Sequence, residues 1–229
     1  MNLGVRDAEV AELMDDPDCD PRRLAATLRR FDTVNRLVSG WGGVYRSRLR
    51  PHLAALGRPA RVLDLGCGGG DLPVRLARLA DRDGLDVEWL GVDPDPRAIA
   101  VAQEPTALRV TFRCADAATL LTQGARFDIV LSNHVLHHLS AVELRAFAVD
   151  SLALSAGIVV HSDIRRSRLA YGLYSVGVTP FARGTFLRTD GLRSIRRSYR
   201  VDELAAVLGD PWQVSTASPF RILAVGAGG

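Results

Sequence analysis

The chain has 229 residues, of which 47% are hydrophobic and 24% are charged, and its formal net charge is +3. This length and balance are those of one soluble globular domain with additions, and they exclude a disordered chain. No apolar run approaches the roughly 18 residues that cross a bilayer, so we predict no membrane span. Three cysteines, Cys19, Cys67 and Cys114, have no metal-like spacing. They predict reduced thiols and a cytoplasmic protein.

The first 57 residues are predicted to be helical. Asp7 is expected to cap a short helix, and Pro21 to begin a longer one with an apolar face. The glycine-rich stretch 39–43 ends that helix, and a third helix is expected from near Val44 to about residue 57. The apolar face of the helix that begins at Pro21 comprises Leu24, Leu28, Phe31, Val34 and Val38. Residues 1–57 are therefore interpreted as an N-terminal helical cap.

Residues 58–229 alternate between short apolar runs and helix-like segments. Asp95 and Ser140 are typical helix caps, and residues 201–208 predict a short helix. Strands that alternate with helices favour a parallel sheet with right-handed crossovers. The predicted strands are 61–65, 87–92, 109–113, 127–131 and 157–161, followed by a closing antiparallel pair, 212–216 and 220–225. We predict a Rossmann-like, doubly wound, mostly parallel seven-stranded α/β sheet with an antiparallel C-terminal strand and a substrate-covering insertion at about 163–198.

A glycine-rich turn follows the first predicted strand, in the segment 62–70. Ligands of open α/β sheets bind beyond the carboxyl ends of the strands. A dinucleotide site would require G-x-G-x-x-G, and counting from Gly66 the third glycine falls on Asp71. A pyrophosphate would then meet a carboxylate where it needs positive potential. The acidic turn, which also contains Asp64, suits a cationic ligand better.

The segment 59–163 resembles the class I S-adenosylmethionine (SAM)-dependent methyltransferases. In that resemblance, Asp64 and the Gly66–Gly68 turn, with Cys67, match the motif that holds the methionine part of SAM. Asp93, followed by Pro94, matches the acidic residue that accepts both ribose hydroxyls. The family forms S-adenosylhomocysteine as the cofactor product.

Two later segments extend the resemblance. Asp116 and Ala117 match residues near the adenine amino group, and Asn133 with His134 matches the segment beside the transferred methyl group. The segment after the fourth strand faces the junction of cofactor and substrate in this family. The candidate general bases there are His134, His137 and His138. Methyl transfer depends mainly on alignment, so a dedicated base is not required.

The two flanks are expected to determine the acceptor. The segment 30–46 resembles the helical cap of small-molecule methyltransferases, including those of quinone and aromatic polyketide biosynthesis. Arg36 and Arg46 are candidates for the SAM carboxylate. Candidate substrate-contacting residues are Trp41, Tyr45, Asp163 and Arg166.

The most favoured function is methylation of a small molecule, at a hydroxyl oxygen of an aromatic or polyketide-like secondary metabolite. The alternatives are a C-methyltransferase of a quinone-type precursor, an RNA methyltransferase that uses the arginines of 165–200, and a non-catalytic SAM-binding accessory protein. No nucleic-acid partner is expected, because no RNA-binding module is evident. No metal is expected either, because Asn133 and Asp163 lack a third ligand. The sequence leaves the acceptor and the oligomeric state open.

Overall fold

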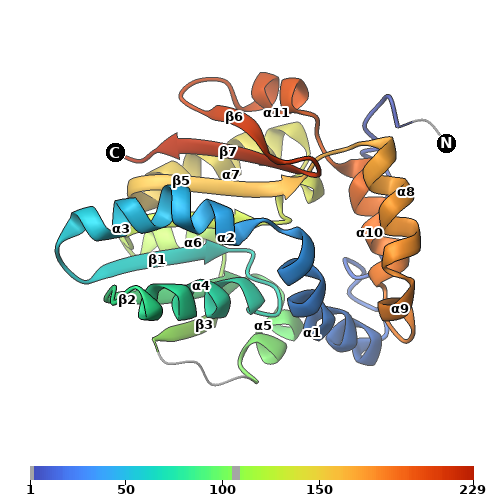
Figure 1. Ribbon diagram of the computed structural model, residues 1–229, viewed down its shortest axis with the longest axis horizontal. Coiled ribbons are helices and arrows are strands. Elements are labelled where there is room, and N and C mark those ends of the chain that lie inside the picture. The colour runs from blue at the N-terminus through green and yellow to red at the C-terminus, as the bar shows by residue number, and fades with distance from the viewer. Residues whose placement is uncertain (1–2, 105–108) are drawn as a thin grey trace.

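The computed structural model describes residues 3–104 and 109–229, and Figure 1 shows their arrangement. Seven strands form one sheet in the order β3-β2-β1-β4-β5-β7-β6. β7 is antiparallel to both of its neighbours, and the other pairs are parallel. The strands are β1 (Ala60–Leu65), β2 (Val87–Asp93), β3 (Val110–Cys114), β4 (Phe127–Asn133), β5 (Ser155–Ile164), β6 (Gln213–Ser218) and β7 (Arg221–Ala227). The predicted fold class is confirmed.

Helices connect the strands and extend the chain at both ends. Before the sheet lie α1 (Pro21–Val38), α2 (Trp41–Val44), the π-helix η1 (Tyr45–Leu49) and α3 (Arg50–Leu56). The crossovers contain α4 (Asp71–Arg82), α5 (Pro96–Ala102), α6 (Ala117–Thr122), the 3₁₀-helix η2 (Leu136–His138) and α7 (Ala141–Leu154). After β5 come α8 (Arg168–Gly177), α9 (Thr179–Ala182), α10 (Leu187–Arg197) and α11 (Val201–Leu208).

The sheet separates two apolar cores, as the alternation of side chains along β1 requires. Val62 packs in the core that contains α2, α3 and α4, whereas Leu63 and Leu65 pack in the core that contains α6 and α7. Helices α1, α8, α9 and α10 group beyond the end of the sheet toward which β1 and β5 point (Figure 1). They therefore cover the carboxyl ends of the parallel strands.

Most helix starts lie where the sequence predicts them. Asp20 caps α1 at Pro21, Asp95 caps α5, and Ser140 forms the predicted capping box with Glu143. The predicted insertion between β5 and α11 contains three helices, α8, α9 and α10. Among the described residues, no helix is long and apolar enough to cross a membrane.

Two N-terminal predictions are wrong in detail. Residues 3–20 form no helix, because their backbone groups bond to distant residues: the amides of Leu13 and Met14 donate to Asp190, and that of Asp7 to Arg196. The third helical stretch begins at Trp41 rather than near Val44. Its apolar side chains share the core with β1 and α4. Part of the predicted cap therefore belongs to the central fold.

Candidate active site

The turn after β1 approaches its surroundings too closely for a side chain at Gly66. Gly66 has a φ of 74°, and a Cβ atom added there would lie 2.6 Å from a methyl group of Val135. The amides of Gly66 and Cys67 both donate to the carbonyl of Val92 on β2. The glycine thus lets the turn fold tightly against β2 and the loop after β4.

Asp64 is a buried acid at the end of β1, with 1% of its surface exposed. Neither carboxylate oxygen has a hydrogen-bond partner among the described residues. Burial, followed by the charges of Asp71 and Asp93, raises the pKa of Asp64 well above its usual range. A buried carboxylate without partners is costly unless a ligand compensates it. Its position lining a cavity therefore fits the cationic methionine end of the predicted cofactor.

Asp93 ends β2 beside the same turn. One carboxylate oxygen accepts from the amide of Gly68 at 2.9 Å, and the other accepts from the amide of Asp95 at 2.9 Å. Burial raises the pKa of Asp93, although these two amides oppose that shift. Each oxygen keeps a further lone pair for a ligand hydroxyl. The amides therefore fix the carboxylate in the orientation that a ribose would meet.

A cavity of about 740 Å³ joins this turn to the helical cover. Such a volume is typical of pockets for small molecules and cofactors. One wall is the glycine turn with Asp64 and Asp93. A second wall is apolar and comes from α1, α8, α9 and α10, with Phe31, Val34, Val38, Leu173, Tyr174, Phe181 and Ile195. The cavity thus has a polar cofactor-like end and an apolar chamber beneath the cover.

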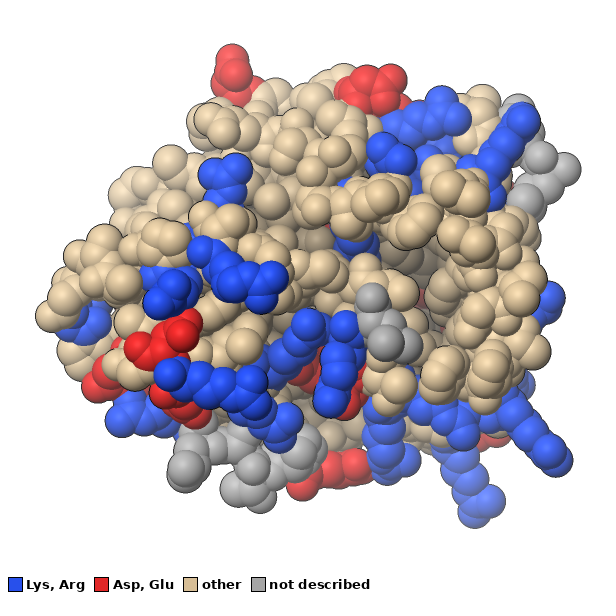
Figure 2. Space-filling model, viewed as in Figure 1, with Lys and Arg blue, Asp and Glu red and all other residues tan. Residues whose placement is uncertain are grey.

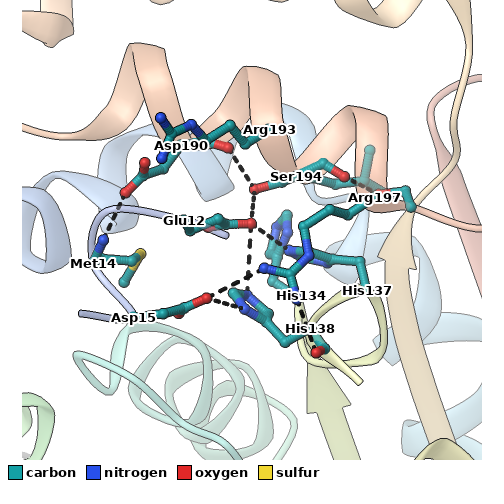
Figure 3. A network of polar contacts seen from close by, with 12 residues as sticks. Glu12, Met14, Asp15, His134, His137, His138, Asp190, Arg193, Ser194 and Arg197 are labelled. Carbon is teal, nitrogen blue, oxygen red and sulfur yellow. Dashed lines mark hydrogen bonds and ion pairs between the residues drawn. The ribbon is translucent and has the colours of Figure 1, made fainter. Parts of the chain in front are cut away.

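A third wall is a polar cluster that includes Glu12, His134, His137 and His138, with the exposed Asp15 at its edge (Figure 3). The backbone amide and Nδ1 of His137 both bond to Asp163, at 2.8 and 2.7 Å. On its other side, Nε2 of His137 lies 3.2 Å from Oε1 of Glu12. Burial alone would lower the pKa of His137, but Asp163 and Glu12 raise it to about 9. His137 is then a cation at neutral pH and lacks the free lone pair of a general base.

The other two histidines of the cluster have different partners. Nδ1 of His138 lies 3.1 Å from Asp15 and, because a carboxylate only accepts, must carry the hydrogen. Nε2 of His134 lies 2.9 Å from the guanidinium of Arg221, which only donates. Burial, followed by the charge of Arg221, lowers the pKa of His134 well below its usual range. His134 is therefore neutral.

The arginine-rich segment 165–200 largely holds residues 3–15 in place. Arg193 donates to the carbonyl of Ala11, Arg196 pairs with Asp7, and Arg197 pairs with Asp15. Buried Arg166 donates to the carbonyls of Leu3 and Ser198. On the face in Figure 2, basic side chains are scattered, with acidic ones among them. These contacts give much of the segment a structural role.

Several predicted residues meet at the cavity. Asp64, Gly66, Cys67, Gly68, Asp93, Pro94, Asn133, His134, His137 and His138 all line it.

Trp41 and Tyr45 lie elsewhere. Both are buried in the core, where Trp41 donates to Asn133 and the Tyr45 hydroxyl donates to Asp83. Neither lines the cavity, because their helical stretch packs against the sheet.

The remaining predicted residues also lie outside the cavity lining. Arg36 is exposed and pairs with Asp32, and Arg46 is exposed. Asp116 is exposed and caps α6, which begins at Ala117. Asp163 and Arg166 lie behind the wall: Asp163 supports His137, and Arg166 bonds to the N-terminal segment. The contacts predicted for these residues with cofactor or substrate stay predictions.

Three residues of the cluster were not predicted from the sequence. Glu12 and Asp15 lie in an irregular segment that has no motif, and Arg221 begins the last strand. They reach the site through contacts that span 87 to 182 residues, such as Arg221 with His134 and Glu12 with Ser194. Such pairings leave no local pattern, and a covariation signal among relatives is what would have revealed them.

Comparison with known proteins agrees with the geometry. Residues 62–153 match the family described as "Methyltransferase domain". The chain is 32% identical over 231 residues to a ubiquinone biosynthesis O-methyltransferase of Azorhizobium caulinodans, covering 90% of this chain and 87% of the relative. A protein of the same name from Brucella suis is 35% identical over 120 residues, which are 51% of this chain but 46% of the relative.

Solved structures share the fold at low identity. The plantazolicin methyltransferase BpumL in complex with S-adenosylhomocysteine gives a TM-score of 0.62 at 14% identity, covering 91% of this chain and 95% of that chain. Human N-acetylserotonin methyltransferase in complex with SAM gives 0.58 at 14% identity, covering 88% of this chain and 55% of that chain.

Proposed function

The chain belongs to the class I SAM-dependent methyltransferases, and on that premise we propose that it methylates a hydroxyl oxygen of a small aromatic or polyketide-like molecule. SAM supplies the methyl group and leaves as S-adenosylhomocysteine. The observation that carries the proposal is the joint cavity, in which an apolar chamber and a buried polar cluster adjoin the SAM-type turn. The relative from Azorhizobium caulinodans, named for O-methylation in ubiquinone biosynthesis, supports the same chemistry.

We assign the cofactor end to residues that line one wall of that cavity. Asp64 would pair with the ammonium group of the methionine part, because its two oxygens have no other partner among the described residues. Asp93 would accept the ribose hydroxyls while the amides of Gly68 and Asp95 hold its orientation. The turn at Gly66 would let the cofactor approach the main chain closely.

We assign the acceptor end to the apolar chamber and the polar cluster. An aromatic ring would lie against residues such as Phe31 and Phe181, with its hydroxyl toward His137 and His138. The hydroxyl would donate a hydrogen bond to the cluster, and this bond would orient the oxygen toward the cofactor end of the cavity. This alignment would be the main contribution that the protein makes to the transfer.

The test is an acceptor screen with product analysis. Purified protein is incubated with SAM and a panel of phenols, catechols and hydroxylated quinone precursors, and the products are identified by mass spectrometry and NMR. We expect a methoxy signal on a hydroxylated aromatic ring and none on ring carbon. Asp64→Asn, which removes the proposed ammonium partner, is the matched control with weakened SAM binding.

A product methylated at ring carbon would refute O-methylation and favour the quinone-type C-methyltransferase. Transfer to RNA, with none to the small molecules, would refute the small-molecule assignment. SAM binding without transfer to either class would favour an accessory protein.

A further inference from the structure

Three potential ligand atoms converge in the polar cluster. Glu12, His137 and His138 each contribute one such atom, and the three atoms lie within 4.8 Å of one another. Oε1 of Glu12 lies 3.2 Å from His137 Nε2 and 3.9 Å from His138 Nε2. Ligand atoms about 2.1 Å from a tetrahedral metal ion are separated by roughly 3.4 Å. The observed separations lie on both sides of that value.

The outer contacts of both histidines are those of metal ligands. Nδ1 of His137 donates to Asp163, and Nδ1 of His138 donates to Asp15. Metal-bound histidines almost always donate the second ring hydrogen to a carboxylate or carbonyl, which turns the other nitrogen toward the ion. Figure 3 shows both rings beside the Glu12 carboxylate, with His138 also joined to Asp15.

The convergent atoms are also poorly satisfied by the protein. His137 is 1% exposed, and its Nε2 has no aligned hydrogen-bond partner among the described residues, although Glu12 is near. Glu12 is 4% exposed and accepts from the hydroxyl of Ser194. Within residues 3–104 and 109–229, no arginine lies within ion-pair distance of Glu12. The countercharge of Glu12 is thus the protonated ring of His137, and a metal ion bound at Nε2 would displace that proton and become the cation beside Glu12.

We propose that Glu12, His137 and His138 bind one divalent first-row transition-metal ion of the Zn²⁺ or Fe²⁺ class on the acceptor wall of the cavity. Two imidazoles and one carboxylate suit these borderline ions better than Mg²⁺, which prefers an all-oxygen shell. This site reverses the sequence prediction that no metal is bound, since that prediction considered ligands only after the fourth and fifth strands. Glu12, from the irregular N-terminal segment, supplies the missing ligand.

The site gives the polar cluster a specific role. Three protein ligands leave coordination positions open, as in catalytic zinc sites, and the three residues line the cavity. An open position would hold the acceptor oxygen and lower the pKa of its hydroxyl, so that no histidine needs to act as base. This role rests on the proposed O-methylation, whereas metal binding itself does not.

The test measures binding directly, without SAM or acceptor. Tag-free protein is stripped with a chelator and titrated with Co²⁺, whose visible absorption reports imidazole coordination, and retained Zn²⁺ is measured by mass spectrometry after gel filtration. We expect one ion per chain, displaced by Zn²⁺ but not by excess Mg²⁺. Glu12→Gln and His138→Gln should abolish the Co²⁺ bands. Asp15→Asn, which changes the outer contact of His138 and leaves the three proposed ligands in place, should weaken binding by roughly 10–100-fold.

Matched controls lie nearby. Glu9→Gln changes an exposed acid of the same segment, and His52→Gln changes a histidine outside the cluster; both should bind Co²⁺ like the wild type. Circular dichroism checks folding. If Glu12→Gln does not fold, Co²⁺ binding by His138→Gln, at a part-exposed position, provides the test. Absence of stoichiometric binding, or bands unchanged in His138→Gln, would overturn the metal site. Neither result would contradict the proposed O-methylation. Conversely, a protein that binds the metal ion but methylates no hydroxyl would refute the proposed function and not the metal site.

Discussion

The two ends of the cavity are built in different ways. At the cofactor end, Asp64 and Asp93 lie at the ends of two neighbouring parallel strands, and the turn is fixed by main-chain bonds to β2. At the acceptor end, the wall comes from an irregular N-terminal segment and from η2 and α10, joined by side-chain contacts across most of the chain. The first end depends on the sheet that every member of the fold must form. The second depends on individual ion pairs and hydrogen bonds.

This difference predicts which substitutions each end of the cavity tolerates. The sheet positions the cofactor end, so substitutions that change its backbone geometry, such as those at the glycine turn, affect folding and SAM binding together. The acceptor end can be altered without disturbing the sheet, because its residues meet through side chains of separate segments. The two ends should therefore respond differently to substitution: cofactor-end variants lose SAM affinity, and acceptor-end variants raise the KM of the acceptor.

The largest effect is expected at Gly66. Gly66→Ala places a methyl group 2.6 Å from Val135 in a backbone conformation that disfavours side chains. Strain and overpacking together should lower the free energy of unfolding by about 2–5 kcal/mol and displace the turn. Thermal unfolding and calorimetric SAM titration measure both effects. Gly84→Ala is the control, because Gly84 has a φ of 69° but no atom lies within 4 Å of a methyl group added there; equal losses in both variants would assign the effect to strain alone.

Asp64→Asn should weaken SAM binding by about 10–100-fold, since a charged partner of a buried ammonium contributes about 1.5–3 kcal/mol. Titration calorimetry measures the affinity. Folding stability should not fall, because the buried carboxylate has no partner in the described part of the protein. A SAM affinity equal to that of the wild type would remove Asp64 from the cofactor site.

The same residue predicts a pH dependence. Burial raises the pKa of Asp64 in the free protein, whereas an ammonium partner would lower it. Binding should therefore release a proton, and SAM affinity should rise with pH until Asp64 is ionised in the free protein. Calorimetry in buffers of different ionisation enthalpy detects the release, which Asp64→Asn should abolish. Proton uptake by the wild type would contradict this assignment.

Sequence was informative where local rules determine structure. The glycine turn, the strand-end acids and the capped helices at Asp95 and Ser140 follow from spacing and capping, and the structure has them where predicted. The N-terminal helix failed because Asp190 satisfies the amides of two residues about 177 positions away. Trp41 and Tyr45 lie in the core and not in the cavity lining, and apolarity alone does not distinguish a core side chain from a pocket wall.

A substitution at Asp190 tests the acceptor end, where the KM of the acceptor and not the SAM affinity is expected to change. Asp190→Ala removes the acceptor of both the Leu13 and the Met14 amides, so the segment that carries Glu12 should open locally. We expect the KM of the acceptor to rise about tenfold with little change in SAM affinity, because hydrogen bonds to a charged group contribute about 1.5–3 kcal/mol. Steady-state kinetics measure the split. Arg188→Ala, at an exposed position on the same helix, is the control; a matched loss of SAM affinity would mean that the two ends are coupled.

The smallest effect is expected at Asp116, where the contribution of the carboxylate to helix capping can be separated from its contribution to SAM binding. Oδ1 of Asp116 accepts from the amide and hydroxyl of Thr119 and so caps α6. Asparagine caps helices about as well, so Asp116→Asn should leave the melting temperature unchanged. If the carboxylate also accepts from the adenine amino group, SAM affinity should fall twofold to tenfold, about 0.5–1.5 kcal/mol. A loss of affinity without a loss of stability would add Asp116 to the cofactor end, whereas unchanged affinity would restrict it to capping α6.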